Sequence, residues 1–470
     1  MIRLTVAEVA VAVGGRIADG TDPAVVVTGP VVVDSRAVTP GCLFAALPGE
    51  RVDGHDFAAA AVAAGAVATL GSRETGTPGV LVTDPLAALA ALARHLLGRL
   101  PDLTVVGVTG SSGKTGTKDI LACLLGGLGP TVAPEGSYNN ELGVPLTALR
   151  AGAGTSHLVV EMGARHPGNI TYLCGVTPPR IGVVLNVGAA HLGEFGSREV
   201  TAATKGELVE ALPADGVAVL NADDPLVAAM AARAAARVVR FGESAAADVR
   251  AEEVRLDDLA RPGFRLVTPA GSAPVTLALH GVHHVANALA AAAVAGELGM
   301  APDEIAAALG DCRAGSRWRM EVTSREDGVL VVNDAYNANP DSTRAALKAL
   351  ATMGRPSSGP GRRTWAVLGE MLELGDEATH EHDAIGRLAV RLDVSRVVAV
   401  GQGARMIHEG AGREGSFGGE SVWVPDVPAA LDLLRDQLAP GDVVLVKASR
   451  AVGLDRLAEE LLHDAAGAAR

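Results

Sequence analysis

The sequence predicts an α/β protein of three domains, in which the central domain has a mostly parallel sheet. Apolar, β-branched segments alternate along the chain with alanine- and leucine-rich segments of helical periodicity. Repeated strand–helix units of this kind form parallel sheets with helices on both faces. The chain has 470 residues, of which 48% are hydrophobic and 20% charged, and this indicates a globular protein long enough for roughly three domains.

The expected domains cover residues 1–100, 101–313 and 314–470. Pro101 breaks a helical segment, and the apolar strand that follows it should start a sheet of its own. Near residue 314 the alternation of strands and helices begins again after a long alanine-rich helix. We therefore expect a small α/β domain, a central parallel-sheet domain and a second α/β domain at the end.

Cap and turn residues set the expected elements of the first domain. Thr5 and Glu8 form a capping box, so a short helix should open the chain. Asp84 and Pro85 are an N-cap and a first-turn proline. Strands are expected at residues 24–34, 41–47 and 80–83, and helices at 57–64, with Asp56 as its cap, and at 85–97.

The other two domains are expected to repeat the strand–helix unit. A hairpin is expected at 264–280, because the two alternating segments flank Pro269, Ala270 and Gly271. Strands are expected at 105–108, 158–161, 181–187, 217–221, 328–333, 364–368, 396–400, 421–424 and 442–446, and a packed helix within 282–300.

The segment LTVVGVTGSSGKTGT, residues 103–117, predicts a phosphate-binding loop. It joins a buried strand to a helix through a turn that contains Gly110, Ser111, Ser112 and Gly113 and ends at Lys114 and Thr115. Backbone N–H groups and the positive end of the helix would surround a phosphate, the lysine would reach it, and the threonine hydroxyl could bind Mg²⁺. The strict Walker spacing would require glycine at position 108, where the chain has valine. A glycine-rich turn with an exposed lysine is the alternative.

Polar side chains follow several predicted strands of the central domain, at Lys114, Glu161, His191 and Asn221. Ligands of parallel sheets bind beyond the carboxyl ends of the strands, so these residues should share one site. Glu161 could ligate a magnesium ion that bridges nucleotide phosphates, or it could cap a helix or pair with an arginine. His191 could be a metal ligand or a general base, although a lone histidine is more often structural.

Lysine is rare in this chain and occurs only at positions 114, 118, 205, 348 and 447. Where arginine is the usual cation, a lysine can mark a place that needs a compact amine. Lys205 and Lys447 therefore become candidates for a functional role, while Lys118 and Lys348 are interpreted as surface residues.

Two further groups of polar residues each have two alternative interpretations. Asn139 and Asn140 could bind a ligand or simply form a turn. Asp334 and Asn337, between a strand and a helix, could position a nucleotide or substrate, or merely cap that helix.

The net charge and the cysteine pattern argue against several kinds of partner and site. A net charge of −14 argues against a nucleic acid as the main partner. The four cysteines are scattered without a CxxC pair, so neither a zinc site nor a disulfide framework is indicated. The start of the chain has no long apolar region, and the most apolar long segment, 282–300, is too polar for a membrane span. We expect a cytoplasmic protein.

Several of these blocks, in this order, resemble the Mur ligases of bacterial cell-wall synthesis over essentially the whole chain. TGSSGKT is similar to the family's ATP loop, including its departure from Walker spacing, and DSRAVTPGCLFAALPGERVDGHDF is similar to a uridine-diphosphate-binding domain. Further similar blocks are GSYNNELGVPLT, VVEMGA, NVGAAHLGEFGS, NDAYNANP and LGEMLELG. The last two are typical of the member that adds D-alanyl-D-alanine.

The resemblance implies a UDP-binding domain, a P-loop ATPase domain and a Rossmann-like C-terminal domain. It implies ATP and two Mg²⁺ ions as cofactors, with Thr115 and Glu161 at one ion and His191 and Lys205 at the other. Family lysines at the position of Lys205 are carbamylated by CO₂, which converts a cation into a metal-binding anion. Roles in catalysis are implied for Lys114, His191, Lys205 and Asp334.

Binding roles follow from the same resemblance. ATP would contact the loop from Gly110 to Thr115 together with His283, Asn287 and Arg319. The substrate would contact the turn at 49–57 and the residues Ser35, Arg36, Asn139, Asn140, Tyr336, Asn337 and Lys447, with Ser449 and Arg450 beside the last. The family has asparagine after the histidine of its GxHN block, where this chain has His284. The resemblance is therefore weakest for the residues that would contact adenine.

The implied activity is an ATP-dependent ligase that joins D-Ala-D-Ala to UDP-N-acetylmuramoyl-tripeptide through an acyl phosphate, in a chain expected to act as a monomer. One alternative is a sibling Mur ligase or folylpolyglutamate synthase that adds a single amino acid. The other is a P-loop kinase or a nucleotide-sensing binding protein, which would not need Glu161, His191 and Lys205 together.

Overall fold

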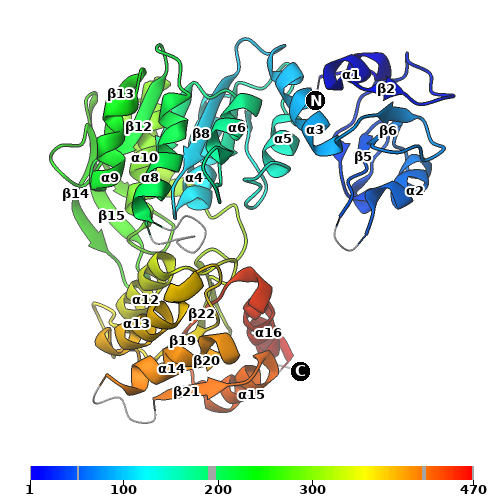
Figure 1. Ribbon diagram of the computed structural model, residues 1–470. Coiled ribbons are helices and arrows are strands. Elements are labelled where there is room, and N and C mark those ends of the chain that lie inside the picture. Colours follow the sequence, from blue (N-terminus) through cyan, green and yellow to red (C-terminus); the bar gives the residue numbers. More distant parts are fainter. Residues whose placement is uncertain (1, 50–51, 189–196, 415–419, 468–470) are drawn as a thin grey trace.

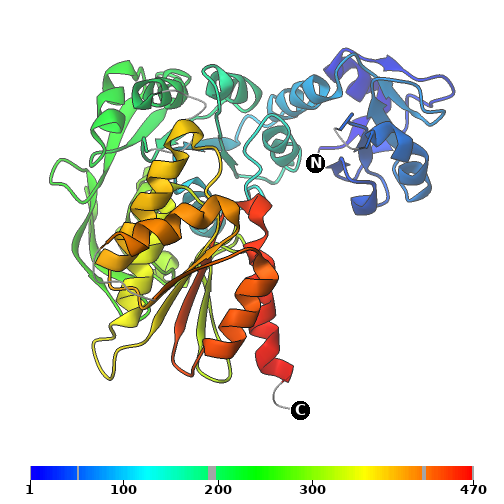
Figure 2. The same ribbon diagram turned by 60° about the horizontal axis from the view of Figure 1, so that its bottom comes forward.

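A computed structural model describes residues 2–49, 52–188, 197–414 and 420–467, and it arranges them in three α/β units (Figure 1). The N-terminal unit, blue in Figures 1 and 2, lies at one end of the central unit. The C-terminal unit, yellow to red, packs against another side of the central unit. The three-domain α/β prediction is therefore confirmed.

The N-terminal unit has a five-stranded sheet in the order β2-β7-β6-β5-β4 and a separate β1-β3 pair, counted over the described residues. The expected capping box is present, since the Thr5 hydroxyl accepts from the Glu8 N–H and the Glu8 carboxylate accepts from the Thr5 N–H. The elements are β1 Leu4–Thr5, α1 Val6–Val13, β2 Arg16–Ile17, β3 Val26–Val27, β4 Val31–Val32, η1 Ser35–Ala37, β5 Leu43–Ala45, η2 Gly54–Phe57, α2 Ala58–Ala63, β6 Ala68–Gly71, β7 Gly79–Leu81 and α3 Pro85–Leu97.

Two expectations for this unit are wrong in detail. The single strand expected at 24–34 is two short strands, β3 and β4, which belong to different sheets. Between them Gly29 passes so close to Cys42 that an added Cβ would lie 2.8 Å from the Cys42 nitrogen. Asp56 does not cap the next helix; the carboxylate of Asp53 caps the 3-10 turn η2 by accepting from the His55 N–H.

Helix α3 joins the N-terminal unit to the central unit. It begins as expected, with the Asp84 carboxylate accepting from the N–H groups of Leu86 and Ala87. Its buried leucines, among them Leu89 and Leu96, belong to one continuous hydrophobic core that extends into the central unit. The two units are thus linked by packed apolar side chains as well as by the chain itself.

The central unit is built on a nine-stranded sheet in the order β16-β15-β14-β13-β12-β11-β8-β10-β9, counted over the described residues. The strands from β9 to β14 are parallel, and β15 and β16 form the expected antiparallel hairpin. Its strands are β8 Thr104–Thr109, β9 Thr131–Val132, β10 His157–Glu161, β11 Ile181–Val184, β12 Val217–Asn221, β13 Arg237–Gly242, β14 Val249–Leu256, β15 Pro262–Thr268 and β16 Gly271–Thr276.

Helices cover both faces of this sheet because its strands are apolar on both sides. Helices α4 and α10 share one core with Val106 and Val159, and helices α6 and α8 share another with Leu158 and Val160. The helices are α4 Lys114–Leu128, α5 Gly143–Ala148, α6 Asn169–Val176, α8 Arg198–Glu210, α9 Pro225–Ala228, η3 Ala229–Arg233, α10 His284–Glu297 and α11 Pro302–Asp311.

Among its described residues, the C-terminal unit has a six-stranded sheet in the order β17-β18-β22-β19-β20-β21, with all neighbours parallel except β17 and β18. All five strands expected here are present. The elements are β17 Glu321–Ser324, β18 Leu330–Asn333, α12 Pro340–Gly354, β19 Thr364–Leu368, η4 Gly375–Glu377, α13 Ala378–Arg391, β20 Arg396–Val400, η5 Gln402–Ala404, α14 Arg405–Gly412, β21 Ser421–Val424, α15 Val427–Gln437, β22 Val443–Lys447, η6 Arg450–Val452 and α16 Leu454–Gly467.

A disulfide joins Cys123 and Cys312, which corrects the expectation that no cysteines pair. The two residues are 189 positions apart, and the packing of α11 against α4 brings their Cα atoms to 5.9 Å. Spacing along the chain cannot reveal a pair made by tertiary packing. Cys42 and Cys174 are free and buried.

No helix among the described residues is long and apolar enough to cross a membrane.

Candidate active site

The loop after β8 has the form expected of a phosphate loop. Gly113 is the N-cap of α4 and has a φ of +81°, a left-handed conformation that glycine adopts without strain. A Cβ at Gly113 would also lie 2.6 Å from the Asn287 amide oxygen, so the helix α10 side chain supports the loop from behind. The Lys114 ammonium donates to the Gly110 carbonyl at 2.8 Å, across the loop.

Thr115 and Glu161 form the polar centre beside this loop. The Thr115 hydroxyl donates to one Glu161 carboxylate oxygen at 3.0 Å, and the carboxylate is almost completely buried. The other oxygen accepts from the Ser137 hydroxyl at 3.0 Å and from the Asn139 amide at 2.7 Å. Helix α4 and the loop between β9 and α5 therefore converge on the carboxylate at the end of β10, and neither Ser137 nor Asn139 was expected to bind it.

Lys205, on α8, is a buried amine beside the same loop. Its side chain is 3% exposed, and burial together with the nearby charge of Lys114 lowers the Lys205 pKa to about 7. Burial also lowers the pKa of Lys114, although the Glu161 carboxylate opposes that shift. The site therefore holds a lysine of which about half is neutral at pH 7.

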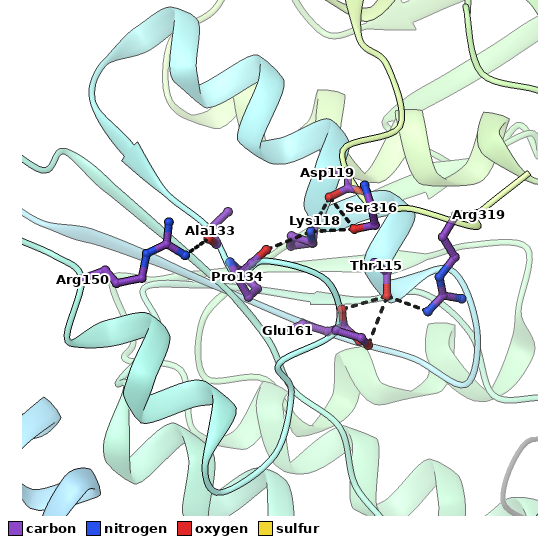
Figure 3. A network of polar contacts seen from close by, with 10 residues as sticks. Thr115, Lys118, Asp119, Ala133, Pro134, Arg150, Glu161, Ser316 and Arg319 are labelled. Carbon is purple, nitrogen blue, oxygen red and sulfur yellow. Dashed lines mark hydrogen bonds and ion pairs between the residues drawn. The ribbon is translucent and has the colours of Figure 1, made fainter. Parts of the chain in front are cut away.

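The C-terminal unit contributes Arg319 and Tyr336 to this centre. An Arg319 N–H donates to the Thr115 hydroxyl at 3.3 Å, and its guanidinium lies 4.2 Å from the centre of the Tyr336 ring (Figure 3 shows the contact with Thr115). The Arg319 Nε is buried and has no hydrogen-bond partner in the described part of the chain. A buried cationic donor without an acceptor fits an anionic ligand at this position.

These groups line one cavity of about 360 Å³ between the central and C-terminal units. Most of the residues expected to form the site contribute to its wall, namely Ser111, Ser112, Gly113, Lys114, Thr115, Asn139, Asn140, Glu161, Lys205, Arg319, Tyr336 and Asn337. Arg165 and Glu373, which the sequence did not single out, face each other across it, with 3.3 Å between the guanidinium and the carboxylate. No local sequence pattern marks such a pair, because its partners come from different domains.

Several expected site residues lie outside the wall of this cavity. Asp334 and Lys447 are a buried pair, in which the Lys447 ammonium donates to the Asp334 carboxylate at 2.6 Å and to the Asn337 carbonyl at 2.9 Å. They therefore support the segment that carries Tyr336 and Asn337. Gly110 belongs to the phosphate loop without lining the cavity, and Asn287 lies behind that loop. Ser35 and Arg36 lie on the N-terminal unit, and His191 lies outside the described residues.

The structure overturns the interpretation of Lys118 as a surface residue. The residue is 3% exposed, and its ammonium contacts Asp119, the Pro134 carbonyl and the Ser316 hydroxyl. Lys348, the other lysine assigned to the surface, is exposed as expected.

His284 replaces the family's asparagine without adding a charge. Burial and the neighbouring His283 hold the His284 pKa well below its ordinary value, so the ring is neutral. Its Nδ1 lies 3.4 Å from the Asn287 amide nitrogen, and the neutral ring can accept a hydrogen bond there. The substitution therefore keeps a polar partner for Asn287 behind the loop.

Family models match three stretches of the chain: a "Mur ligase family, catalytic domain" at residues 30–96, a "Mur ligase middle domain" at 108–295 and a "Mur ligase, glutamate ligase domain" at 318–450. The UDP-N-acetylmuramoyl-tripeptide--D-alanyl-D-alanine ligase of Mycobacterium tuberculosis (strain ATCC 25618 / H37Rv) is 53% identical, over 99% of this chain and 98% of its own length. The chain belongs to the Mur ligase family.

Other Mur ligases are similar over nearly the whole chain. The Escherichia coli (strain K12) enzyme of the same name is 37% identical, over 92% of this chain and 93% of its own length. A solved structure of MurF from Acinetobacter baumannii has a TM-score of 0.87 at 32% identity, covering 98% of this chain and 99% of its own. MurF ligase from Thermotoga maritima, solved in complex with ADP, has a TM-score of 0.80 at 32% identity, covering 94% and 99%.

The oxygen donors of Thr115 and Glu161 at the cavity fit Mg²⁺. The described residues contain no cluster of three or more histidine, cysteine, aspartate or glutamate side chains suited to a metal. Thr115 and Glu161 instead offer one hydroxyl and one carboxylate beside a phosphate loop. Mg²⁺ is bound in this way in nucleotide sites, where phosphates and water complete its shell.

Proposed function

We propose that this chain joins D-alanyl-D-alanine to UDP-N-acetylmuramoyl-tripeptide at the expense of ATP. The observation that carries the proposal is the single cavity in which the phosphate loop, Glu161 and Lys205 meet Arg319 and Tyr336 of the other domain. The chain's similarity, over 99% of its length, to a ligase named for this activity supports the choice of substrates. A carboxylate is a poor electrophile, and transfer of phosphate to its oxygen supplies a leaving group for the incoming amine.

The proposed domains remain residues 1–100, 101–313 and 314–470. The first would hold the uridine nucleotide through Ser35 and Arg36, and the central domain would hold ATP. These limits are supported by the three units, because each unit is built mainly from consecutive helices and strands of the chain. A monomer and a cytoplasmic location remain our proposals as well.

Each residue of the cavity would have a distinct task. Lys114 and the loop N–H groups would bind ATP phosphates, and Arg319 would neutralise phosphate charge from the C-terminal side. Asn139 and Ser137 orient the Glu161 carboxylate through their hydrogen bonds. Tyr336 and Asn337, held by the Asp334–Lys447 pair, would form the wall toward the dipeptide. Closure of the C-terminal domain would exclude water from the acyl phosphate.

Two Mg²⁺ ions would complete the site, one at Thr115 and Glu161 and one at Lys205 and His191. They would neutralise the charge that develops on the transferred phosphate. Lys205 would bind as a carbamate, formed when its neutral amine attacks CO₂ and releases a proton. The lowered pKa of the Lys205 amine supports this, because only the neutral form can attack.

The test is a coupled assay of the purified chain with ATP, Mg²⁺, UDP-N-acetylmuramoyl-tripeptide and D-Ala-D-Ala. We expect ADP release that requires both D-Ala-D-Ala and the UDP-tripeptide, and a product with the mass of the UDP-pentapeptide. Release with a single amino acid in place of the dipeptide would favour a sibling ligase. ADP release that ignores every added amine would favour a kinase or a nucleotide sensor, and no release above background would refute the proposal.

A further inference from the structure

Lys118 and Asp119 are neighbours on α4, one turn beyond the phosphate loop, and their side chains form a buried ion pair. The two side chains are 4% and 10% exposed. Adjacent helical side chains do not normally face each other, so this pairing requires the lysine to bend back toward the aspartate. A buried pair of this kind costs desolvation and is weak evidence for stability alone. The other contacts of Lys118 and Asp119 indicate which segments of the chain this pair holds in place.

The first of these contacts is with the loop that leads to the Glu161 carboxylate. The Lys118 ammonium donates to the Pro134 carbonyl at 3.0 Å. Three residues later, the Ser137 hydroxyl donates to Glu161 and lies 3.4 Å from the Thr115 hydroxyl. Lys118 thus fixes the base of the segment that places Ser137.

The second contact is with the segment that crosses to the C-terminal domain. The Ser316 hydroxyl lies 3.2 Å from the Lys118 ammonium, and the Ser316 N–H donates to the Asp119 carboxylate at 3.0 Å. Three residues later, Arg319 reaches Thr115. Figure 3 shows Lys118, Asp119 and Ser316 beside the Thr115, Glu161 and Arg319 group.

The backbone conformation on both sides of Arg319 indicates that surrounding contacts hold this residue in position. Trp318 and Met320, on either side of it, have φ values of +58° and +49°, which are uncommon for residues other than glycine. Such conformations persist where the surroundings fix the chain at both ends. Asp119 and Lys118 fix one end at Ser316, and the Asp334 carboxylate fixes the other by accepting from the Met320 N–H at 3.1 Å.

We propose that Lys118 is a positioning residue of the ligase reaction, which holds the two segments that bring Ser137 and Arg319 to the Thr115–Glu161 pair. Lys118 itself does not touch the reacting atoms. The inference rests on the proposed function of this cavity as the ATP site. It assigns a role to a lysine that the phosphate-loop motif does not include.

The test compares Lys118→Met, Arg319→Met and the double variant, with Lys348→Met as the matched control at an exposed lysine. We expect Lys118→Met to lower kcat/KM for ATP by about ten- to a hundredfold, as for the loss of hydrogen bonds to a charged group, while KM for the UDP-tripeptide stays within about twofold. Because part of the effect of Lys118 passes through Arg319 and part through Ser137, the double variant should be worse than Arg319→Met by clearly less than the Lys118→Met effect alone. Lys348→Met should match the wild type.

A folded Lys118→Met with unchanged ATP kinetics, or fully additive effects with Arg319→Met, would overturn the inference. If Lys118→Met does not fold, Ser316→Ala decides, because it removes only one hydroxyl. Ser316→Ala should raise KM for ATP a few-fold and be non-additive with Arg319→Met, and unaltered kinetics would count against the proposal. A wild type that lacks dipeptide-dependent ADP release would instead refute the proposed function, so the two failures are distinguishable.

Discussion

At the scale of single residues, the rarity of lysine drew attention to three of the five lysines and missed a fourth that is also buried. Lys114, Lys205 and Lys447 are each held among buried polar groups near the domain boundary. Lys118 is buried too, but its partners Pro134 and Ser316 are 16 and 198 positions away. Local sequence could not show those contacts, which is why Lys118 was assigned to the surface.

The carbamate proposal predicts a specific chemical rescue. Lys205→Ala should reduce ligase activity by at least about a thousandfold, because a metal ligand is lost. Short carboxylic acids such as acetate should restore part of it by occupying the space of the carbamate, and they should not stimulate the wild type or Lys348→Ala. Steady-state ADP release measures this. Full activity in Lys205→Ala would refute the carbamate.

The Lys205 pKa of about 7 also predicts how carbamylation depends on pH. With that pKa about 90% of the amine is neutral at pH 8 and about 10% at pH 6, whereas an ordinary lysine is almost fully protonated at both. Carbamate signal in ¹³C NMR after equilibration with ¹³CO₂ should therefore fall from pH 8 to pH 6. Lys205→Ala is the control that should lose it. A pKa of about 7 predicts a fall of about tenfold, so an equal signal at both pH values, or the fall of about a hundredfold that an ordinary lysine would give, would contradict it.

At the scale of elements, the phosphate loop was predictable because its parts are consecutive in the sequence. Strand, glycine turn and helix all lie within residues 103–128, and the start of α4 was indicated by the local pattern. The support behind the loop was not predictable by the same means. Asn186 accepts from the Ser112 N–H at 2.9 Å, and Asn287 fills the space above Gly113. These contacts depend on which strands and helices become neighbours.

Gly113→Ala tests that support. The added Cβ would be strained at a φ of +81° and would lie 2.6 Å from the Asn287 amide oxygen. We expect the affinity for ATP or ADP to fall by about tenfold or more, because the loop must move to relieve the backbone strain and the close contact with Asn287. Isothermal titration with Mg-ADP measures it. Gly126→Ala on the same helix, where an added Cβ meets nothing within 4 Å, is the control and should bind normally.

At the scale of the molecule, the sequence indicated three units but not how they are joined. The single strand expected at 24–34 divides between two sheets, and the disulfide between Cys123 and Cys312 depends on helix packing. Family blocks placed Arg319 and Tyr336 near the ATP loop, which spacing alone could not do. The Arg165–Glu373 pair across the cavity was missed because nothing in either segment points to the other.

The turn between β14 and β15 is a second junction between the central and C-terminal domains. Ala260 in this turn is fully buried in the core of the C-terminal unit, among residues such as Leu350. Next to it, the Asp258 carboxylate accepts from the Ser357 N–H at 2.7 Å. A central-domain hairpin is therefore inserted into the other domain on the side of the loop at residues 355–363.

Ala260→Asp should separate the two domains without unfolding either. A carboxylate buried in that apolar core has no partner, so the hairpin should leave the C-terminal unit. We expect a larger radius of gyration by X-ray scattering and ligase activity reduced by about a hundredfold or more, because Arg319 and Tyr336 no longer meet the phosphate loop. Ala270→Asp, in the exposed turn between β15 and β16, is the matched control and should change neither quantity. A compact, active Ala260→Asp would show that the cavity does not depend on this junction.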